Sequence, residues 1–217
     1  MWRSCENNDI VRPLGQYGAV VLCGGSSRRM GRDKVWLDCN GQTMLQLVVR
    51  AVDEAVAPVA VAAAPGQPLP DLPDHVTVLR DRRKRAGPLE GLLTALLWAT
   101  ETGLDAVFVT GCDLPMIKPA VVRLVLDRLG DNDVAICRLG SKLQPLLAAY
   151  KTHLIGEVHA LLAASRVSLM ELVNRVKAAT VDEADIRRVD PELQCLWNLN
   201  TPEQYADFLR VFGSRQE

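Results

Sequence analysis

The segment LCGGSSRRMGRDK, residues 22–34, contains the residue types that bind a polyphosphate. Its glycines let backbone N–H groups approach an anion, and Arg29 and Lys34 add long cationic side chains. Five residues separate Gly25 from Gly31, and no lysine follows directly, so the spacing is not that of a P-loop. The dinucleotide pattern GxGxxG is absent as well. The segment predicts a polyphosphate-binding loop of another type, and a solvated basic turn is the alternative.

An acidic residue follows the clearest buried strand of the sequence. The apolar run at residues 106–110 ends in Gly-Cys-Asp-Leu-Pro, which places Asp113 just beyond the strand. One or two carboxylates commonly hold Mg²⁺, while substrate phosphates and waters fill its other positions. The alternative is that Asp113 caps the turn at Pro115. Beside a cationic phosphate loop, we interpret Asp113 as the ligand of a magnesium ion.

The elements that must position these residues alternate between strands and helices. An apolar run at residues 18–23 predicts a strand that ends at the loop, where open α/β sheets bind their ligands. Thr43–Gln46, Ser168–Glu171 and Thr201–Gln204 each have the form of a helix capping box. Further strands are expected at 58–62, 75–80, 134–137 and 146–150, and helices after Thr43, at 88–100, 119–129 and 154–164, after Ser168 and after Thr201. The alternation predicts an α/β fold with a doubly wound, mostly parallel sheet.

Composition narrows the class of protein. The chain has 217 residues, of which 48% are hydrophobic, and this predicts one domain at residues 18–212 with tails at 1–17 and 213–217. A formal net charge of −1 argues against a nucleic acid or an anionic membrane as the main partner. The six cysteines form no CxxC pair, and the three histidines lack metal-ligand spacing. Without a secretory leader or an apolar stretch of ~20 residues, we expect a cytoplasmic enzyme.

Five segments, taken in order, resemble the motifs of molybdenum cofactor guanylyltransferases, the MobA family. They are LCGGSSRRMGRDK (22–34), GPLEGL (87–92), CDLP (112–115), QPLLAAY (144–150) and NLNTPEQY (198–205). The first motif alone indicates the wider class of nucleotidyltransferases, and the ordered set favours MobA over the related cytidylyltransferases. The resemblance spans about residues 18–210. It implies a Rossmann-like nucleotidyltransferase fold with three α/β/α layers.

The same resemblance implies an activity, its partners and its site residues. GMP would pass from Mg-GTP to the phosphate of molybdopterin, with release of pyrophosphate and with transient contacts to other molybdenum cofactor proteins or molybdoenzyme chaperones. Arg29, Lys34 and Asp113 would be catalytic, with Asp113 as the Mg²⁺ ligand. Asp81 matches an acidic nucleotide contact, and its alternative is a surface acid that balances Arg82 and Arg83. The implied nucleotide-binding set is Leu22, Cys23, Gly24, Gly25, Lys34, Asp81 and Asp113.

The acceptor side rests on three residues. Asn198 and Asn200 resemble the family's paired asparagines near the reacting phosphates, and alternate residues of an extended segment share a face. Without the family, both would be read as turn formers before a helix. Arg166 lies where the family tends to carry basic residues for molybdopterin, and a solvated arginine is the alternative.

Two departures from the family pattern limit what the resemblance implies. Residues 62–67 lack the asparagine that often recognises the purine in the family, so guanine selectivity is not carried over at that position. Gln144 stands where many members have histidine. The alternatives are therefore a nucleotidyltransferase that uses CTP or another phosphorylated acceptor, and a non-catalytic nucleotide-binding protein.

Overall fold

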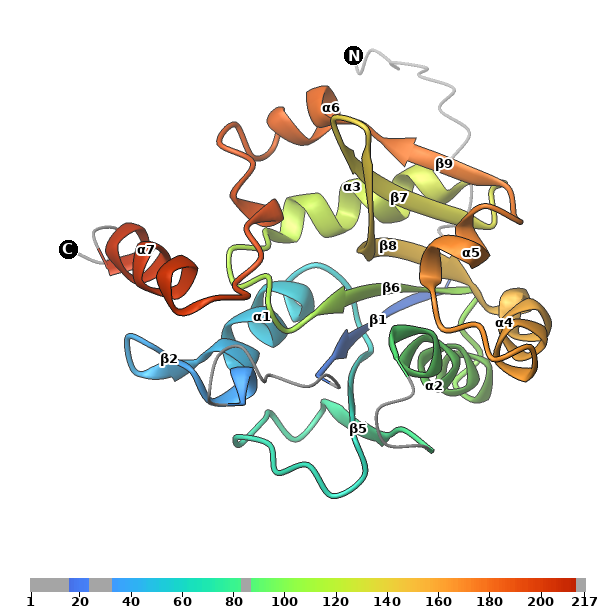
Figure 1. The fold of residues 1–217 in the computed structure, drawn as a ribbon, viewed down its shortest axis with the longest axis horizontal. Coiled ribbons are helices and arrows are strands. Elements are labelled where there is room, and N and C mark those ends of the chain that lie inside the picture. Colours follow the sequence, from blue (N-terminus) through green and yellow to red (C-terminus); the bar gives the residue numbers. More distant parts are fainter. Residues whose placement is uncertain (1–15, 24–32, 83–86, 214–217) are drawn as a thin grey trace, which may run out of the picture.

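A seven-stranded sheet forms the centre of the computed structural model, which describes residues 16–23, 33–82 and 87–213 (Figure 1). From edge to edge its strands are β5 (Thr77–Arg80), β4 (Val59–Ala63), β1 (Tyr17–Leu22), β6 (Ala106–Gly111), β8 (Lys142–Lys151), β7 (Val134–Leu139) and β9 (Ala178–Val181). β8 pairs antiparallel with β6 and β7, whereas the other pairs of neighbours in this sheet are parallel. The predicted mostly parallel sheet is confirmed.

Helices cover both faces of the sheet, as the predicted three layers require (Figure 1). The helices on one face are α1 (Met44–Asp53), α3 (Pro119–Leu129) and the short α6 (Glu183–Arg187), and those on the other are α2 (Pro88–Glu101), α4 (Ile155–Ala163) and α5 (Leu169–Val173). Successive strand side chains point to opposite faces, so Ala19 and Val21 join the first core while Val20 and Leu22 join the second. The continuous apolar run of β1 thus fills two cores.

A smaller core attaches the last helix beside the sheet. α7 (Pro202–Gly213) packs Phe208 against Leu37 and Met44, next to the hairpin of β2 (Asp38–Cys39) and β3 (Gln42–Thr43). Figure 1 shows α7 at one side of the molecule, to the left of α1 and above β2. This packing fixes the segment that precedes α7.

Two of the three predicted capping boxes form. Thr43 N donates to Gln46 Oε1 at 2.8 Å and Gln46 N to Thr43 Oγ1 at 3.3 Å, and Thr201 and Gln204 repeat the arrangement. The expected box at Ser168 is wrong, because Ser168 makes no side-chain cap bond. The Glu171 carboxylate that would close it lies 3.5 Å from Arg166 instead.

No helix in the described part of the chain combines the length and apolar character needed to cross a membrane.

Asp190 is a fully buried carboxylate that ties α3 to the segment before Cys195. Its Oδ1 lies 2.6 Å from Lys118 Nζ, and its Oδ2 accepts the backbone N–H of Cys195 at 2.8 Å. Burial alone would raise the pKa of Asp190, but the Cys195 N–H and the Lys118 ammonium outweigh it and lower this pKa. The ionised form therefore favours the folded state.

Replacing Asp190 by Ala is expected to lower the free energy of unfolding at pH 7 by about 3 kcal/mol, because the change leaves a buried donor and a partly buried ammonium unpaired. The stabilisation exists above the unfolded pKa near 3.8 and is lost as the pH falls through the lowered folded pKa, so the difference from the parent protein should shrink in that range. Urea titrations at several pH values measure it. Asp182→Asn, which removes a carboxylate from an exposed pair with Arg138, is the control. Equal losses in both variants would contradict the prediction.

Candidate nucleotide site

Three residues distant in sequence meet at the carboxyl edge of the sheet. Lys34 starts a short 3-10 helix (Lys34–Trp36), Asp113 follows β6, and Asn200 precedes α7. Lys34 Nζ donates to Asp113 Oδ2 at 3.2 Å and to Asn200 Oδ1 at 2.7 Å. The Lys34 and Asp113 side chains are 15% and 23% exposed, so water reaches the pair but does not surround it. We call these three residues the Lys34 cluster.

Local backbone features hold Asp113 in this position. A Cβ on Gly111 would lie 2.6 Å from Asp113 Oδ1, so glycine lets the carboxylate fold back over the strand end. The backbone carbonyl of Asp113 accepts the N–H of Leu199 at 2.9 Å. Leu199 is buried between the half-exposed Asn198 and Asn200, and this bond therefore brings both asparagines next to the Asp113 turn.

The donor set of the cluster suits a hard cation. Within the described ranges, no group of three or more His, Cys, Asp or Glu side chains gathers. Asp113 contributes one carboxylate, and Asn200 contributes an amide oxygen that accepts from the same Lys34 Nζ. A site with a single carboxylate and remaining positions for phosphate oxygens and water is typical of Mg²⁺ rather than of zinc.

Two buried cysteines, Cys23 and Cys112, lie where β1 and β6 end. Cys23 N donates to Ala62 O at 2.8 Å, and Cys112 N donates to Leu22 O at 3.1 Å, so the sheet pairing continues past the strand. A hydrogen bond with the Cys112 thiol, together with burial, raises the pKa of Cys23 well above its ordinary value. A protonated, buried thiol is a poor nucleophile, so the Cys23 side chain is unsuited to covalent catalysis.

The N-terminus of α2 lies at the same edge. Gly91 packs directly on β1, where an added Cβ would lie 3.1 Å from Leu22 Cδ1. The helix begins three residues earlier at Pro88, and its first N–H groups and dipole favour a negatively charged ligand. The close contact through Gly91 brings this positive end toward the strand end.

Asp81 lies beside α2 after β5. Its N–H donates to Ala63 O at 2.9 Å, and its Oδ1 accepts the hydroxyl of Thr94 at 3.0 Å. Burial raises the pKa of Asp81, the Thr94 hydroxyl opposes this effect, and the nearby Glu90 reinforces it. The sequence alone did not indicate Thr94, although a polar residue within the apolar helix 88–100 was a usable signal.

Replacing Asp81 by Asn is expected to stabilise the empty protein and weaken nucleotide binding. A carboxyl group whose pKa is raised in the folded state leaves the free energy of unfolding unchanged below its unfolded pKa near 3.8. It lowers the free energy of unfolding fully once the pH exceeds its folded pKa. Asn keeps an oxygen for Thr94 without the charge, so the melting temperature at pH 7 should rise by roughly 1–2 °C, and the difference should vanish near pH 3.5. The family resemblance implies that Asp81 contacts the nucleotide, and loss of such a charged contact should raise the Kd for GTP about tenfold. Calorimetry measures both quantities, and a lower melting temperature with unchanged GTP binding would contradict the prediction.

Other predicted residues lie elsewhere. Gly24, Gly25 and Arg29 fall outside the described residues. Arg166 is 59% exposed and pairs with Glu171 at 3.5 Å, on the helical layer that contains α5. The structure brings Lys34, Asp113 and Asn200 together and places Arg166 in a different ion pair.

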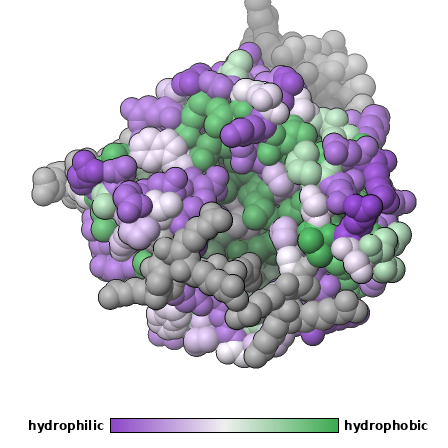
Figure 2. Space-filling model, viewed as in Figure 1, coloured by the Kyte–Doolittle hydropathy of each residue, from purple (hydrophilic) through white to green (hydrophobic). Residues whose placement is uncertain are grey.

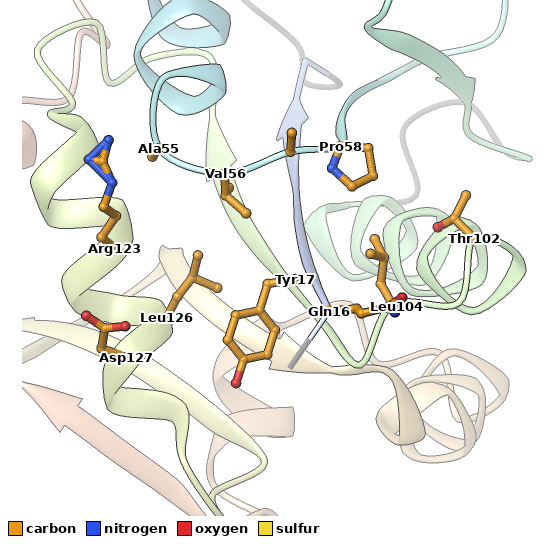
Figure 3. A pocket seen from close by; sticks show the side chains of 11 residues that line it. Gln16, Tyr17, Ala55, Val56, Pro58, Thr102, Leu104, Arg123, Leu126 and Asp127 are labelled. Carbon is orange, nitrogen blue, oxygen red and sulfur yellow. The ribbon is translucent and has the colours of Figure 1, made fainter. Parts of the chain in front are cut away.

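The surface over β1 and β6 is hollowed. Figure 2 shows a recess lined by hydrophobic residues near the middle of this face, bordered by hydrophilic ones. A different pocket of about 630 Å³ lies at the amino ends of β1, β4 and β6, where Tyr17, Pro58, Leu104 and Leu126 line it (Figure 3). Open α/β sheets bind ligands at the carboxyl ends of their strands, so this second pocket is on the wrong edge for the nucleotide.

Comparisons with known proteins show which family the chain resembles. The family model of the MobA-like NTP transferase domain matches residues 19–180. A probable molybdenum cofactor guanylyltransferase of Mycobacterium tuberculosis is 37% identical over 171 residues, which cover 77% of this chain and 84% of the relative. A molybdenum cofactor guanylyltransferase of Desulfosudis oleivorans is 28% identical over 187 residues, which cover 85% of this chain and 90% of the relative.

Solved structures share the fold. The molybdopterin-guanine dinucleotide biosynthesis protein A of Archaeoglobus fulgidus superposes with a TM-score of 0.77 at 19% identity, over 91% of this chain and 99% of that one. The 2-C-methyl-D-erythritol 4-phosphate cytidylyltransferase of Thermus thermophilus gives a TM-score of 0.65 at 17% identity, over 91% and 99%. At such identities the likeness concerns the fold alone.

Proposed function

The chain belongs to the MobA-like NTP transferase family, and we propose that it transfers GMP from Mg-GTP to the phosphate of molybdopterin. An oxygen of the molybdopterin phosphate attacks the α-phosphorus of GTP, a new P–O–P link forms, and the bond to the β-phosphate breaks to release pyrophosphate. The product is molybdopterin guanine dinucleotide. The names of the relatives support the guanylyl group and the acceptor.

The Lys34 cluster is the observation on which this mechanism depends. In-line transfer between phosphates needs fixed geometry and neutralised charge rather than a covalent intermediate. Lys34 places a positive charge at the carboxyl edge of β1 and β6, where it neutralises phosphate oxygens of GTP. Asn200 orients the Lys34 ammonium through the 2.7 Å bond.

Asp113 is the proposed ligand of the divalent metal, which we propose to be Mg²⁺. When bound, the ion supplies Lewis-acid charge to the phosphate oxygens. The Asp113 carboxylate already faces a positive charge, because Lys34 Nζ lies 3.2 Å from its Oδ2. The family's use of a divalent metal supports a metal ion at Asp113, and the experiment below tests which metal it is.

Pyrophosphate release with each nucleotide tests the proposal. With molybdopterin and Mg²⁺, GTP should give turnover, CTP should give little, and omission of molybdopterin or addition of EDTA should stop the reaction. Replacement of Mg²⁺ by Mn²⁺ determines which ion the site prefers. Equal or better turnover with CTP would exclude the guanylyl assignment, and transfer of labelled GMP to another phosphorylated acceptor would exclude molybdopterin as the specific substrate. A cytoplasmic location and transient protein partners stay predictions.

A further inference from the structure

A tight turn after β4 presents one side chain toward the nucleotide site. In residues 64–67, Gln67 N donates to Ala64 O at 3.1 Å, Pro65 occupies the second position, and Gly66 has a φ of +71°. Proline followed by a glycine with positive φ is the pattern of a type II turn. Ala64 N also donates to Gln67 Oε1 at 3.1 Å, so the side chain closes the turn a second time.

Arg80, on the neighbouring strand β5, fixes this turn from outside. Its Nη1 donates to Gln67 O at 2.7 Å and to Ala64 O at 3.3 Å. The backbone of Gln67 therefore has bonds within the turn and to the adjacent strand. Because its backbone is fixed, the Gln67 side chain loses less conformational entropy when its amide makes further hydrogen bonds.

The amide nitrogen of Gln67 bonds to the residue after β1 and to the residue before Lys34. Nε2 donates to Cys23 O at 3.3 Å and to Asp33 Oδ2 at 2.9 Å. Cys23 is the residue after β1, and Asp33 is the residue before Lys34. The two amide protons and the amide oxygen of Gln67 are thus all used within the protein.

Asp33 passes this constraint to Lys34. Its second oxygen, Oδ1, accepts the N–H of Val35 at 3.4 Å and caps the short helix that begins at Lys34. One carboxylate therefore connects Gln67 to the start of the helix from which Lys34 reaches Asp113 and Asn200. A change in the position of Asp33 would redirect the Lys34 ammonium.

We propose that Gln67 is a positioning residue for GTP, which holds Cys23 and Asp33 at a fixed separation and thereby aims Lys34 at the phosphates. The inference rests on the proposed function and assigns Gln67 no contact with the base. Reading of guanine by the same amide would require the bonds to Cys23, Asp33 and Ala64 to break.

The test reverses the polarity of the Gln67–Asp33 bond. Gln67→Glu keeps an oxygen for Ala64 but sets a carboxylate against Asp33, and kcat/KM for GTP should fall about 30-fold. Asp33→Asn alone leaves one acceptor oxygen for two donors, Gln67 Nε2 and Val35 N–H, and should also lose activity. In the double variant the new amide at position 33 can donate to the new carboxylate at position 67, while the amide oxygen still caps Val35. The value of kcat/KM should then recover to within about fivefold of the parent, without the bond to Cys23.

Two further measurements separate positioning from other roles. The Kd for Mg-GTP, measured by calorimetry, should follow the same loss and recovery, and this readout stays valid if the protein binds GTP but transfers no GMP, in which case only the proposed function fails. Arg80→Met, which loosens the turn without touching the amide, should give a smaller loss in the same direction. Gln16→Glu, at the opposite edge of the sheet, is the control for added charge.

Several outcomes would overturn the inference. Kinetic constants of Gln67→Glu within twofold of the parent, or absence of recovery in the double variant, would show that the bond to Asp33 does not position Lys34. A change in preference between GTP and CTP would assign Gln67 to base recognition instead. If Gln67→Glu does not fold, the Kd of Arg80→Met for Mg-GTP is the deciding measurement. A Kd equal to that of the parent protein would then overturn the inference.

Discussion

Asp113→Asn is expected to lower kcat/KM for GMP transfer on the order of 10³-fold at saturating Mg²⁺. The substitution preserves the size of the side chain and an oxygen that can accept from Lys34, but it removes the charge that would hold the metal. Loss of several kcal/mol of transition-state stabilisation corresponds to this factor, since each 1.36 kcal/mol is tenfold. Initial rates of pyrophosphate release, measured over a range of Mg²⁺ concentrations, give the value.

Binding without metal separates this role from a structural one. In EDTA, Asp113→Asn should bind GTP at least as tightly as the parent protein, because it removes a negative charge that repels the triphosphate and leaves Lys34 cationic. With Mg²⁺ the order should reverse. Asp182→Asn, an exposed acid paired with Arg138, should change neither constant. If Asp113→Asn retained a tenth of the parent activity, or lost GTP binding equally with and without metal, the metal assignment would be wrong.

The sequence predicted the fold well where hydrophobic patterns are continuous. β4 and β6 are buried along their whole length and β1 is buried after its first residue, and the apolar runs of these strands are visible without any contact information. β9, at the edge of the sheet, was missed because its residues Ala178–Val181 are mostly exposed or half-exposed, so no strong pattern marks it. The capping box at Ser168 failed for another reason, since Arg166 competes for the Glu171 carboxylate.

The candidate site was only partly predictable, because its geometry joins distant segments. Lys34 and Asp113 stand out by residue type at a strand end, but Lys34 and Asn200 are 166 residues apart, and their bond depends on the packing of α7 through Leu199 and Phe208. Gln67 gave no signal beyond the Pro-Gly turn beside it. Its two bonds to Cys23 and Asp33 follow from the pairing of β4 with β1, which local sequence patterns do not specify.

Lys34→Met is expected to lower kcat/KM for GMP transfer about 300-fold, because it removes the ammonium that bonds Asp113 and Asn200 and is proposed to neutralise the phosphates. Methionine keeps an unbranched side chain of similar length, so the stem packing should be largely retained. GTP binding should weaken both in Mg²⁺ and in EDTA, since the lysine neutralises phosphate charge directly. That response to EDTA distinguishes Lys34 from Asp113, whose removal should weaken binding only when metal is present.

The double variant tests whether the two charges act as one unit. If Lys34 and Asp113 together stabilise the same transition state, the effects of their substitutions should not add. Lys34→Met/Asp113→Asn should then lose little more activity than Asp113→Asn alone. Lys151→Met, in the last residue of β8 and opposite the first residue of β6, is the control for loss of a lysine charge. Lys34→Arg should recover only part of the activity, because a planar guanidinium cannot place its charge as a compact ammonium does between Asp113 and Asn200. Full multiplicative losses in the double variant would mean that the two residues act independently, and the shared role of the Lys34 cluster would then have to be abandoned.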